Sequence, residues 1–145
     1  MGWFNSSSHH LVLIVTVVLS LYQFSLVSGI FFERVHVYVL NELEPGKTLS
    51  LHCKSKDDDL GMQQIIFNQT YEWSFHNNFF GRTLFWCFMS WEKSLGVYAS
   101  GSFNIYEGSR DQFRCRKRCW WKIKEDGLFS LNRDSFIWEH LYDWP

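Results

Sequence analysis

The sequence has only two prolines and four cysteines in 145 residues, and it lacks the motifs of several enzyme classes. It contains no G-x-S-x-G element, which excludes the nucleophile elbow of a serine hydrolase. The four cysteines are expected to pair with one another, which leaves no thiol for a cysteine enzyme. Outside the first 29 residues the histidines are His36, His52, His76 and His140, and their spacing is not that of metal ligands. We therefore expect a protein that is not an enzyme.

The first 29 residues contain no Lys, Arg, Asp or Glu, whereas all 14 basic and 15 acidic side chains lie in residues 30–145. Leu11–Leu19 is an apolar run, interrupted only by Thr16, with the length of a signal-peptide core. Val27-Ser28-Gly29 places a small residue directly before a possible signal-peptidase site and a tolerable one at position −3, so we expect cleavage after Gly29. Polar residues after the run disfavour the alternative, a type II membrane anchor. The sequence thus predicts a signal peptide over 1–29 and a secreted single domain over 30–145.

Secretion makes two disulfides the expected state of Cys53, Cys87, Cys115 and Cys119. Cys115 and Cys119 are the only close pair, and no second Cys or His pair completes a zinc site. Since only three residues separate these two, we favour the pairs Cys53–Cys119 and Cys87–Cys115, each joining distant strands. Asn68-Gln69-Thr70 is an acceptor for N-linked glycosylation, so the loop around Asn68 is expected at the surface.

Alternation of apolar and polar residues with a period of two runs through most of residues 30–145 and predicts strands. Val35–Leu40 and Leu49–Cys53 alternate on either side of a turn at Pro45-Gly46, so we expect a first hairpin. Thr83–Trp91 is apolar on both faces, which predicts burial between two layers. Further strands are expected at 71–75, 97–106, 112–115, 119–124, 127–131 and 136–144.

About eight short strands and no convincing helical period predict an all-β fold. We expect a small antiparallel β-sandwich, stapled by two disulfides, with most Trp and Phe side chains in its core.

Asp57, Asp58 and Asp59 form the densest acidic cluster of the sequence, two residues before Gly61. Such carboxylates suit calcium, but an EF-hand loop starting at Asp57 would have glycine and glutamate where Met62 and Asn68 stand. We expect instead a solvated turn whose Asp side chains accept hydrogen bonds from nearby backbone N–H groups. The three residues remain candidates for contact with a partner.

Seven basic residues and the single acid Asp111 lie between Arg110 and Lys124, a local balance of +6. A hairpin with this charge and with Trp120 and Trp121 beside it would bind a polyanion by charge and stacking. The alternative is a solvated strand edge, where Lys and Arg prevent aggregation. The candidates for partner contact at the hairpin tip are Arg116, Lys117 and Arg118.

Several short elements follow one another in a characteristic order: LHCKSKDDDLG at residues 51–61, YEWSF, GRTLFWC, a trailing Trp91, RDQFRC, CWWKI and DG. Together they resemble the plant self-incompatibility S-protein family. The resemblance covers roughly Val35–Trp144. It implies a small secreted β-sandwich held by two disulfides, with no known catalytic activity and no cofactor. In the founding members of the family the secreted protein is a female determinant that signals to incompatible pollen through a surface receptor.

Two functions of different classes follow from this sequence. One is an extracellular signalling ligand that acts through a cell-surface receptor or another extracellular protein. The alternative is a module that binds a polyanion or a cell-wall polysaccharide through the basic segment 110–124. Nucleic acid is not an expected partner, and no membrane span is expected in the mature chain.

Overall fold

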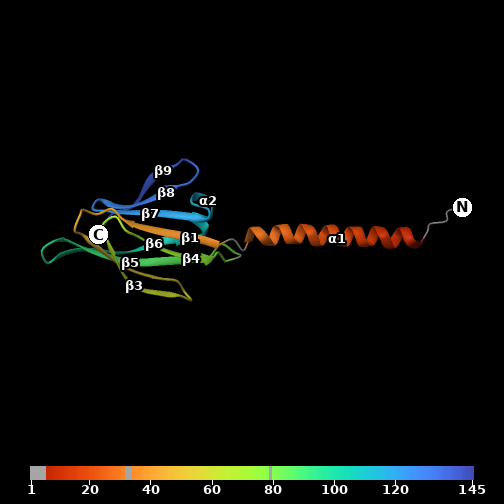
Figure 1. Cartoon of the computed structure of the whole chain (residues 1–145), viewed down its shortest axis with the longest axis horizontal. Coiled ribbons are helices and arrows are strands. Elements are labelled where there is room, and N and C mark those ends of the chain that lie inside the picture. Colours follow the sequence, from red (N-terminus) through yellow and green to blue (C-terminus); the bar gives the residue numbers. More distant parts are fainter. Residues whose placement is uncertain (1–5, 32–33, 79) are drawn as a thin grey trace. The chain divides into compact units, whose positions relative to one another are not determined.

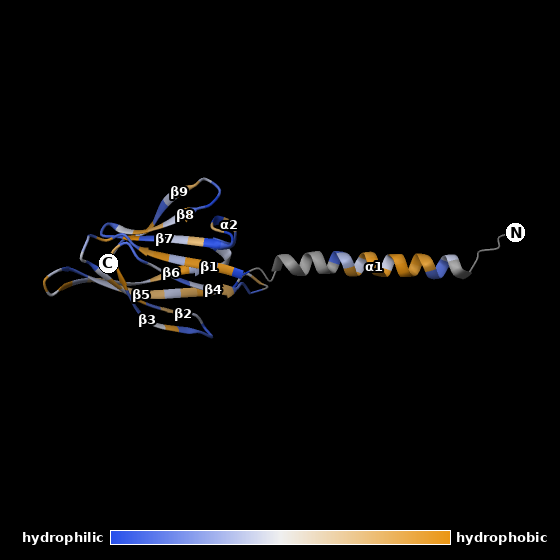
Figure 2. Cartoon of the chain, in the orientation of Figure 1, coloured by the Kyte–Doolittle hydropathy of each residue, from blue (hydrophilic) through white to orange (hydrophobic). Residues whose placement is uncertain are grey.

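The computed structural model describes residues 6–31, 34–78 and 80–145, which form two compact units, one within residues 1–33 and one from Arg34 to Pro145 (Figure 1). The first unit contains the helix α1 (Ser6–Phe31). Apolar residues occupy much of its described length (Figure 2). Among the described residues, no helix is both long enough and apolar enough to cross a membrane.

The second unit is a sandwich of two β-sheets, in which the described residues form nine strands. The five-stranded sheet has the order β4-β1-β7-β8-β9 and consists of β1 (Arg34–Asn41), β4 (Thr70–His76), β7 (Arg118–Lys124), β8 (Gly127–Asn132) and β9 (Ile137–Tyr142). The four-stranded sheet has the order β3-β2-β5-β6 and consists of β2 (Thr48–Lys54), β3 (Asp59–Ile66), β5 (Leu84–Ser94) and β6 (Val97–Glu107). The short helix α2 (Gly108–Arg114) joins the two sheets between β6 and β7. The predicted β-sandwich is confirmed.

The core lies between the sheets, and the alternation in the sequence positions its side chains. Val35, Val37 and Val39 of β1 are buried, while His36 and Tyr38 lie on the opposite face and are half-buried. β2, β5 and β7 repeat this pattern. Full burial of a side chain such as Val or Leu stabilises a fold by about 1.5–3 kcal/mol. The buried row of each strand therefore determines which face of the strand turns inward.

The predicted first hairpin is wrong, because β1 and β2 belong to different sheets. β1 pairs antiparallel with β4 and parallel with β7, whereas β2 pairs with β3 and β5. The side chain of the fully buried Asn41 fixes the crossing between the sheets. Its amide nitrogen donates to the carbonyls of Lys47 at 3.1 Å and Ile65 at 2.7 Å, and its oxygen accepts from the backbone N–H of Leu43 at 3.0 Å. The amide nitrogen and the amide oxygen of Asn41 thus both have hydrogen-bond partners inside the protein, as is usual for a buried polar side chain.

Four further strand predictions differ from the structure. Segment 84–91 does not have two buried faces, because Phe88 on the outer face of β5 is 46% exposed. Residues 112–115 were expected as a strand, but 112–114 end helix α2. β3 was not predicted, because only Ile65 of this edge strand is buried and its apolar alternation is weak. The pair β1–β7 is parallel and not antiparallel, because α2 returns the chain to the first sheet beside β1.

The favoured disulfide pairing is also wrong. Cys53 is bonded to Cys87, and Cys115 is bonded to Cys119. Cys53 and Cys87 lie directly opposite each other on the antiparallel strands β2 and β5, and both face the core. Sequence spacing alone could not reveal this pairing, because it depends on the register between two strands that are 34 residues apart.

Candidate functional site

The basic segment 110–124 does not form one charged hairpin. It runs through α2, a short loop and β7, so its cations lie in three different environments. We name the loop from Cys115 to Cys119 the cationic loop. The predicted hairpin is therefore wrong, and the +6 balance of this segment is divided among separate sets of partners.

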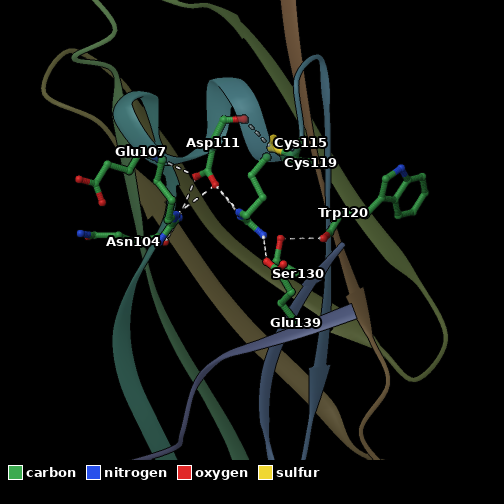
Figure 3. Close-up of a disulfide and its surroundings, with 10 residues drawn as sticks. Asn104, Glu107, Asp111, Cys115, Cys119, Trp120, Ser130 and Glu139 are labelled. Atoms are coloured by element: carbon green, nitrogen blue, oxygen red, sulfur yellow. Dashed lines mark hydrogen bonds and ion pairs between the residues drawn. A yellow bond between two sulfur atoms is a disulfide. The ribbon is translucent and has the colours of Figure 1, made fainter. Parts of the chain in front are cut away.

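Arg110 and Arg114 hold a buried carboxylate and do not form part of an open charged surface. Asp111 is fully buried. Arg110 donates to its carboxylate from Nε at 3.0 Å and from a terminal nitrogen at 2.8 Å. Arg114 donates from Nε at 3.0 Å and from a terminal nitrogen to the same carboxylate. The backbone N–H of Glu107 adds a further bond at 2.8 Å, so Asp111 joins the end of β6 to α2 (Figure 3).

The two guanidinium groups also contact the core and the last strand. They lie 5.8 and 5.6 Å from the ring centre of buried Trp121, and Arg110 donates to the hydroxyl of Tyr142 at 2.7 Å. Burial lowers the pKa of Arg110, but the hydrogen bonds and the charge of Asp111 outweigh burial and raise that pKa above its ordinary value. The only sequence signal for this cluster was an aspartate with one arginine directly before it and another three residues after it. The role of the cluster is structural.

The cationic loop presents Arg116, Lys117 and Arg118 to solvent, because the Cys115–Cys119 disulfide closes the chain around them. The loop is also held by its backbone. The N–H of His36 donates to the carbonyl of Lys117 at 2.8 Å, and the N–H of Arg118 donates to the carbonyl of Cys115 at 3.2 Å. Arg116 contacts exposed Asp134 at 2.8 Å. The structure therefore fixes the backbone of this loop and leaves its three side chains accessible to a partner.

Asp57 and Asp58 lie in the predicted solvated turn and Asp59 begins β3, but of the three side chains only that of Asp59 accepts a bond from a backbone N–H group. The backbone N–H groups of Asp57 and Asp58 donate to the Ser55 hydroxyl, and that of Gly61 donates to Asp59. Asp59 also contacts His52 and, at 2.9 Å, Lys54. The hydrogen bonds from His52, Lys54 and the Gly61 N–H hold the pKa of Asp59 well below its usual range.

The acidic turn borders a groove of about 600 Å³ that the sequence did not predict. Asp57 and Asp58 line it together with His76, the last residue of β4, and Arg82, which lies just before β5. A partner that enters this groove therefore meets both signs of charge. The groove is formed by segments that are distant in sequence, so no local pattern could reveal it.

Replacing Asp59 with asparagine should make the protein less stable at pH 7, and the loss of stability should be smaller at pH 2.5. A carboxylate whose folded pKa is depressed stabilises the fold above its unfolded pKa of about 3.9, and this contribution is lost as the pH falls through the folded pKa. Urea unfolding of the wild type and the Asp59→Asn variant at both pH values measures the effect. Asp57→Asn is the control and should change stability little at either pH. An equal loss for both variants at pH 7 would refute the role of Asp59.

Asn68 is exposed and lies in the turn between β3 and β4, as the acceptor for a glycan must. The N–H of Asn68 donates to the carbonyl of Asn41 at 2.8 Å, and the N–H of Asn41 donates to the carbonyl of Gln69 at 3.1 Å. These backbone bonds fix the turn and leave the Asn68 side chain on the surface.

Fold and site together define a small, disulfide-bonded β-sandwich protein with exposed charged loops at its surface. The sequence matches the family model described as plant self-incompatibility protein S1 over residues 36–144. The chain belongs to this family, which confirms the resemblance seen in the sequence. The family match extends from β1 to the C-terminal end of the chain and includes both disulfides.

Individual relatives agree with this assignment. Self-incompatibility protein S1 of Papaver rhoeas is 34% identical over 110 residues, which cover 75% of this chain and 76% of that protein. S-protein homolog 5 of Arabidopsis thaliana is 38% identical over 110 residues, which cover 74% and 81% of the two chains. A solved structure of the self-incompatibility protein homologues has a TM-score of 0.60 at 19% identity and covers 78% of this chain and 96% of that one. Its family is described as small, highly stable, secreted proteins from plants, which agrees with the extracellular localisation predicted here.

Proposed function

We propose that the protein is a secreted recognition factor that acts on plant cells through a surface receptor. The observation that carries this proposal is the cationic loop, whose backbone is fixed at both ends while Arg116, Lys117 and Arg118 are exposed. A fixed loop loses little conformational freedom on binding, so its charges contribute efficiently to recognition. Membership of the S1 family supports a role in recognition, since a relative is named self-incompatibility protein S1. We propose a binding role and no catalytic one.

We further propose that residues 1–29 are removed on secretion and that Asn68 carries a glycan. The uncharged, apolar segment supports the first point, and the exposure of Asn68 supports the second. Protein collected from the medium of plant cells expressing the full chain provides the material for the binding experiment. Its intact mass, measured before and after removal of N-linked glycans, reports both points. A mass that still includes residues 1–29 would contradict cleavage.

Replacing Arg116, Lys117 and Arg118 with serine should slow association with receptor-bearing cells about tenfold at low salt, because these charges steer an acidic partner toward the loop. The fold should be spared, since exposed ion pairs such as Arg116–Asp134 contribute less than about 1 kcal/mol. The labelled protein is first tested on a panel of plant cells that includes pollen. Association of the wild type and the variant is then measured on a cell type that binds, at several salt concentrations.

The control for this experiment removes the same charge from other exposed positions. Arg34, Arg82 and Lys93 lie outside the cationic loop, and their replacement with serine should leave association nearly unchanged. Equal binding and equal salt dependence of the wild type and the loop variant would refute the proposal. The recognition surface would then be sought at the acidic turn and its groove.

A further inference from the structure

The central strand of the five-stranded sheet sorts its side chains into two chemically different faces. In β7, the side chains of Cys119, Trp121 and Ile123 are buried in the core. The opposite face of the same strand carries Arg118, Trp120, Lys122 and Lys124. In the sequence RCWWKIK the apolar side chains at every second position therefore face the core. The positions between them place a cation, an indole and two further cations on the outer face. Figure 3 shows the Trp120 indole directed away from the Asp111 cluster.

Aromatic side chains of the neighbouring strands extend this face on both sides of β7. Tyr38 on β1 pairs with Trp120 in register, and their rings stack at 4.1 Å with an angle of 9°. On the other side, Phe129 of β8 stacks on His140 of β9 at 4.6 Å. Trp138 of β9 lies on the same face. We name the outer surface formed by Tyr38, Arg118, Trp120, Lys122, Lys124, Phe129 and Trp138 the β7 face.

The lysines of the β7 face lie against these rings and share one carboxylate. The Lys122 ammonium is 4.5 Å from the ring centre of Trp138 and 2.8 Å from Glu42. The Lys124 ammonium is 5.2 Å from the ring centre of Phe129 and 4.0 Å from the second oxygen of Glu42. A single carboxylate thus faces two ammonium groups, whose side chains remain 25% and 42% exposed. An excess of positive charge is therefore held in fixed positions between aromatic rings.

We propose that the β7 face binds a linear acidic polysaccharide, with sugar rings against Trp120 and Trp138 and sugar carboxylates at Lys122 and Lys124. The C–H bonds of a sugar ring carry slight positive charge and pack against the negative faces of aromatic rings. Ammonium groups pair with carboxylates in charge-assisted hydrogen bonds. The four aromatic side chains are half-buried, so their packing in the sheet positions them while part of each ring remains accessible.

The charge of the chain favours a polysaccharide over a nucleic acid. Nucleic-acid-binding domains are strongly basic, with isoelectric points above about 9. This chain has a net charge of −1 and an isoelectric point near 6.6, and the cations of the β7 face are partly neutralised by Glu42. A polymer with one carboxylate on each sugar has a lower charge density than double-stranded DNA, which carries one negative charge per about 1.7 Å of its axis. This binding goes beyond the proposed receptor function and uses a surface that shares only Arg118 with the cationic loop.

The first test is calorimetric titration of the secreted protein with a defined oligogalacturonate. The wild type should bind, and binding should weaken as salt rises, because screening shortens the reach of the lysines from about 10 Å at 0.1 M to about 3 Å at 1 M. The double variant Trp120→Ala, Trp138→Ala should lose at least about tenfold in affinity, since it removes two stacking surfaces. Trp86→Ala is the matched control, because Trp86 is also half-buried but lies on the outside of the other sheet. It should bind as the wild type does.

The second test changes charge and leaves the aromatic packing intact. Replacing Lys122 and Lys124 with glutamine should weaken binding and flatten its salt dependence. Glu42→Gln should do the opposite and strengthen binding by up to about fivefold, because it frees both ammonium groups from their carboxylate. A gain of affinity cannot come from a damaged fold. Arg118 belongs to both surfaces and is left unchanged, so these variants should bind receptor-bearing cells as the wild type does.

Several results would overturn the proposal. The first is that the wild type does not bind oligogalacturonate. The second is that Trp86→Ala loses as much affinity as the Trp120, Trp138 double variant. The third is that Glu42→Gln leaves the affinity unchanged or lowers it. Binding of the fully methyl-esterified, uncharged oligosaccharide with the same affinity would contradict the role of the lysines. Tighter binding of a single-stranded DNA oligonucleotide would identify the β7 face as a nucleic-acid surface instead. Thermal melts of every variant confirm that the binding differences come from folded protein.

Discussion

Replacing Asp111 with asparagine should lower the free energy of unfolding by about 3–5 kcal/mol, the usual effect of removing one partner of a buried ion pair. Asp111 is fully buried, and its carboxylate accepts hydrogen bonds from Arg110, Arg114 and the backbone N–H of Glu107. Asparagine has nearly the same shape but loses the charge and one acceptor. The two guanidinium groups, whose side chains are only 25% and 10% exposed, would then lose the carboxylate that they share, and Arg114 would keep only the 3.9 Å contact with Glu139.

Asp134→Asn is the matched control for this prediction. Asp134 also pairs with an arginine, Arg116, at 2.8 Å, but both side chains are more than half exposed. Its replacement should cost less than about 1 kcal/mol, because water and salt weaken exposed pairs. Guanidinium unfolding followed by tryptophan fluorescence measures both variants. Similar losses for Asp111→Asn and Asp134→Asn would show that burial does not control the strength of these pairs.

Replacing Cys53 and Cys87 with alanine should destabilise the protein by about 4 kcal/mol. A disulfide stabilises mainly by restricting the unfolded chain, and the effect grows with the length of the loop that it closes. This bond joins residues 34 positions apart and links β2 to β5, the two central strands of the four-stranded sheet. Alanine leaves no new polar group in the core, where both cysteines are buried.

The Cys115→Ala, Cys119→Ala variant is the comparison for this experiment. Its disulfide joins residues only four positions apart, so the same entropy estimate gives a loss of about 2 kcal/mol. Urea unfolding under non-reducing conditions measures both variants, and mass spectrometry verifies that the remaining bond is intact. A larger loss for the Cys115, Cys119 variant would contradict the loop-length argument. It would mean that the short bond stabilises the folded state through the cationic loop and the neighbouring end of α2.

The sequence by itself determined the elements that depend on local alternation. Apolar residues at every second position in β1, β2 and β7 must face the core, whichever strands lie beside them, because a strand turns successive side chains to opposite faces. The exposure of the acidic turn and of Asn68 was also predicted correctly, since polar side chains in short local segments determine it. The order of short motifs was specific enough to indicate the family.

Only the tertiary structure decided which strands are neighbours, and therefore which side chains meet. The same alternation in Val35–Leu40 fits a hairpin with β2 or the observed pairs with β4 and β7. The buried Asn41 at the end of β1 is held by contacts with residues 6 and 24 positions away, which no local pattern reveals. The Cys53–Cys87 bond follows from the register of β2 and β5. The basic segment was read as one patch because charge was counted along the chain. Folding instead placed Arg110 and Arg114 around a buried carboxylate and Lys122 and Lys124 among aromatic rings of other strands, because burial and pairing depend on neighbours in space and not in sequence.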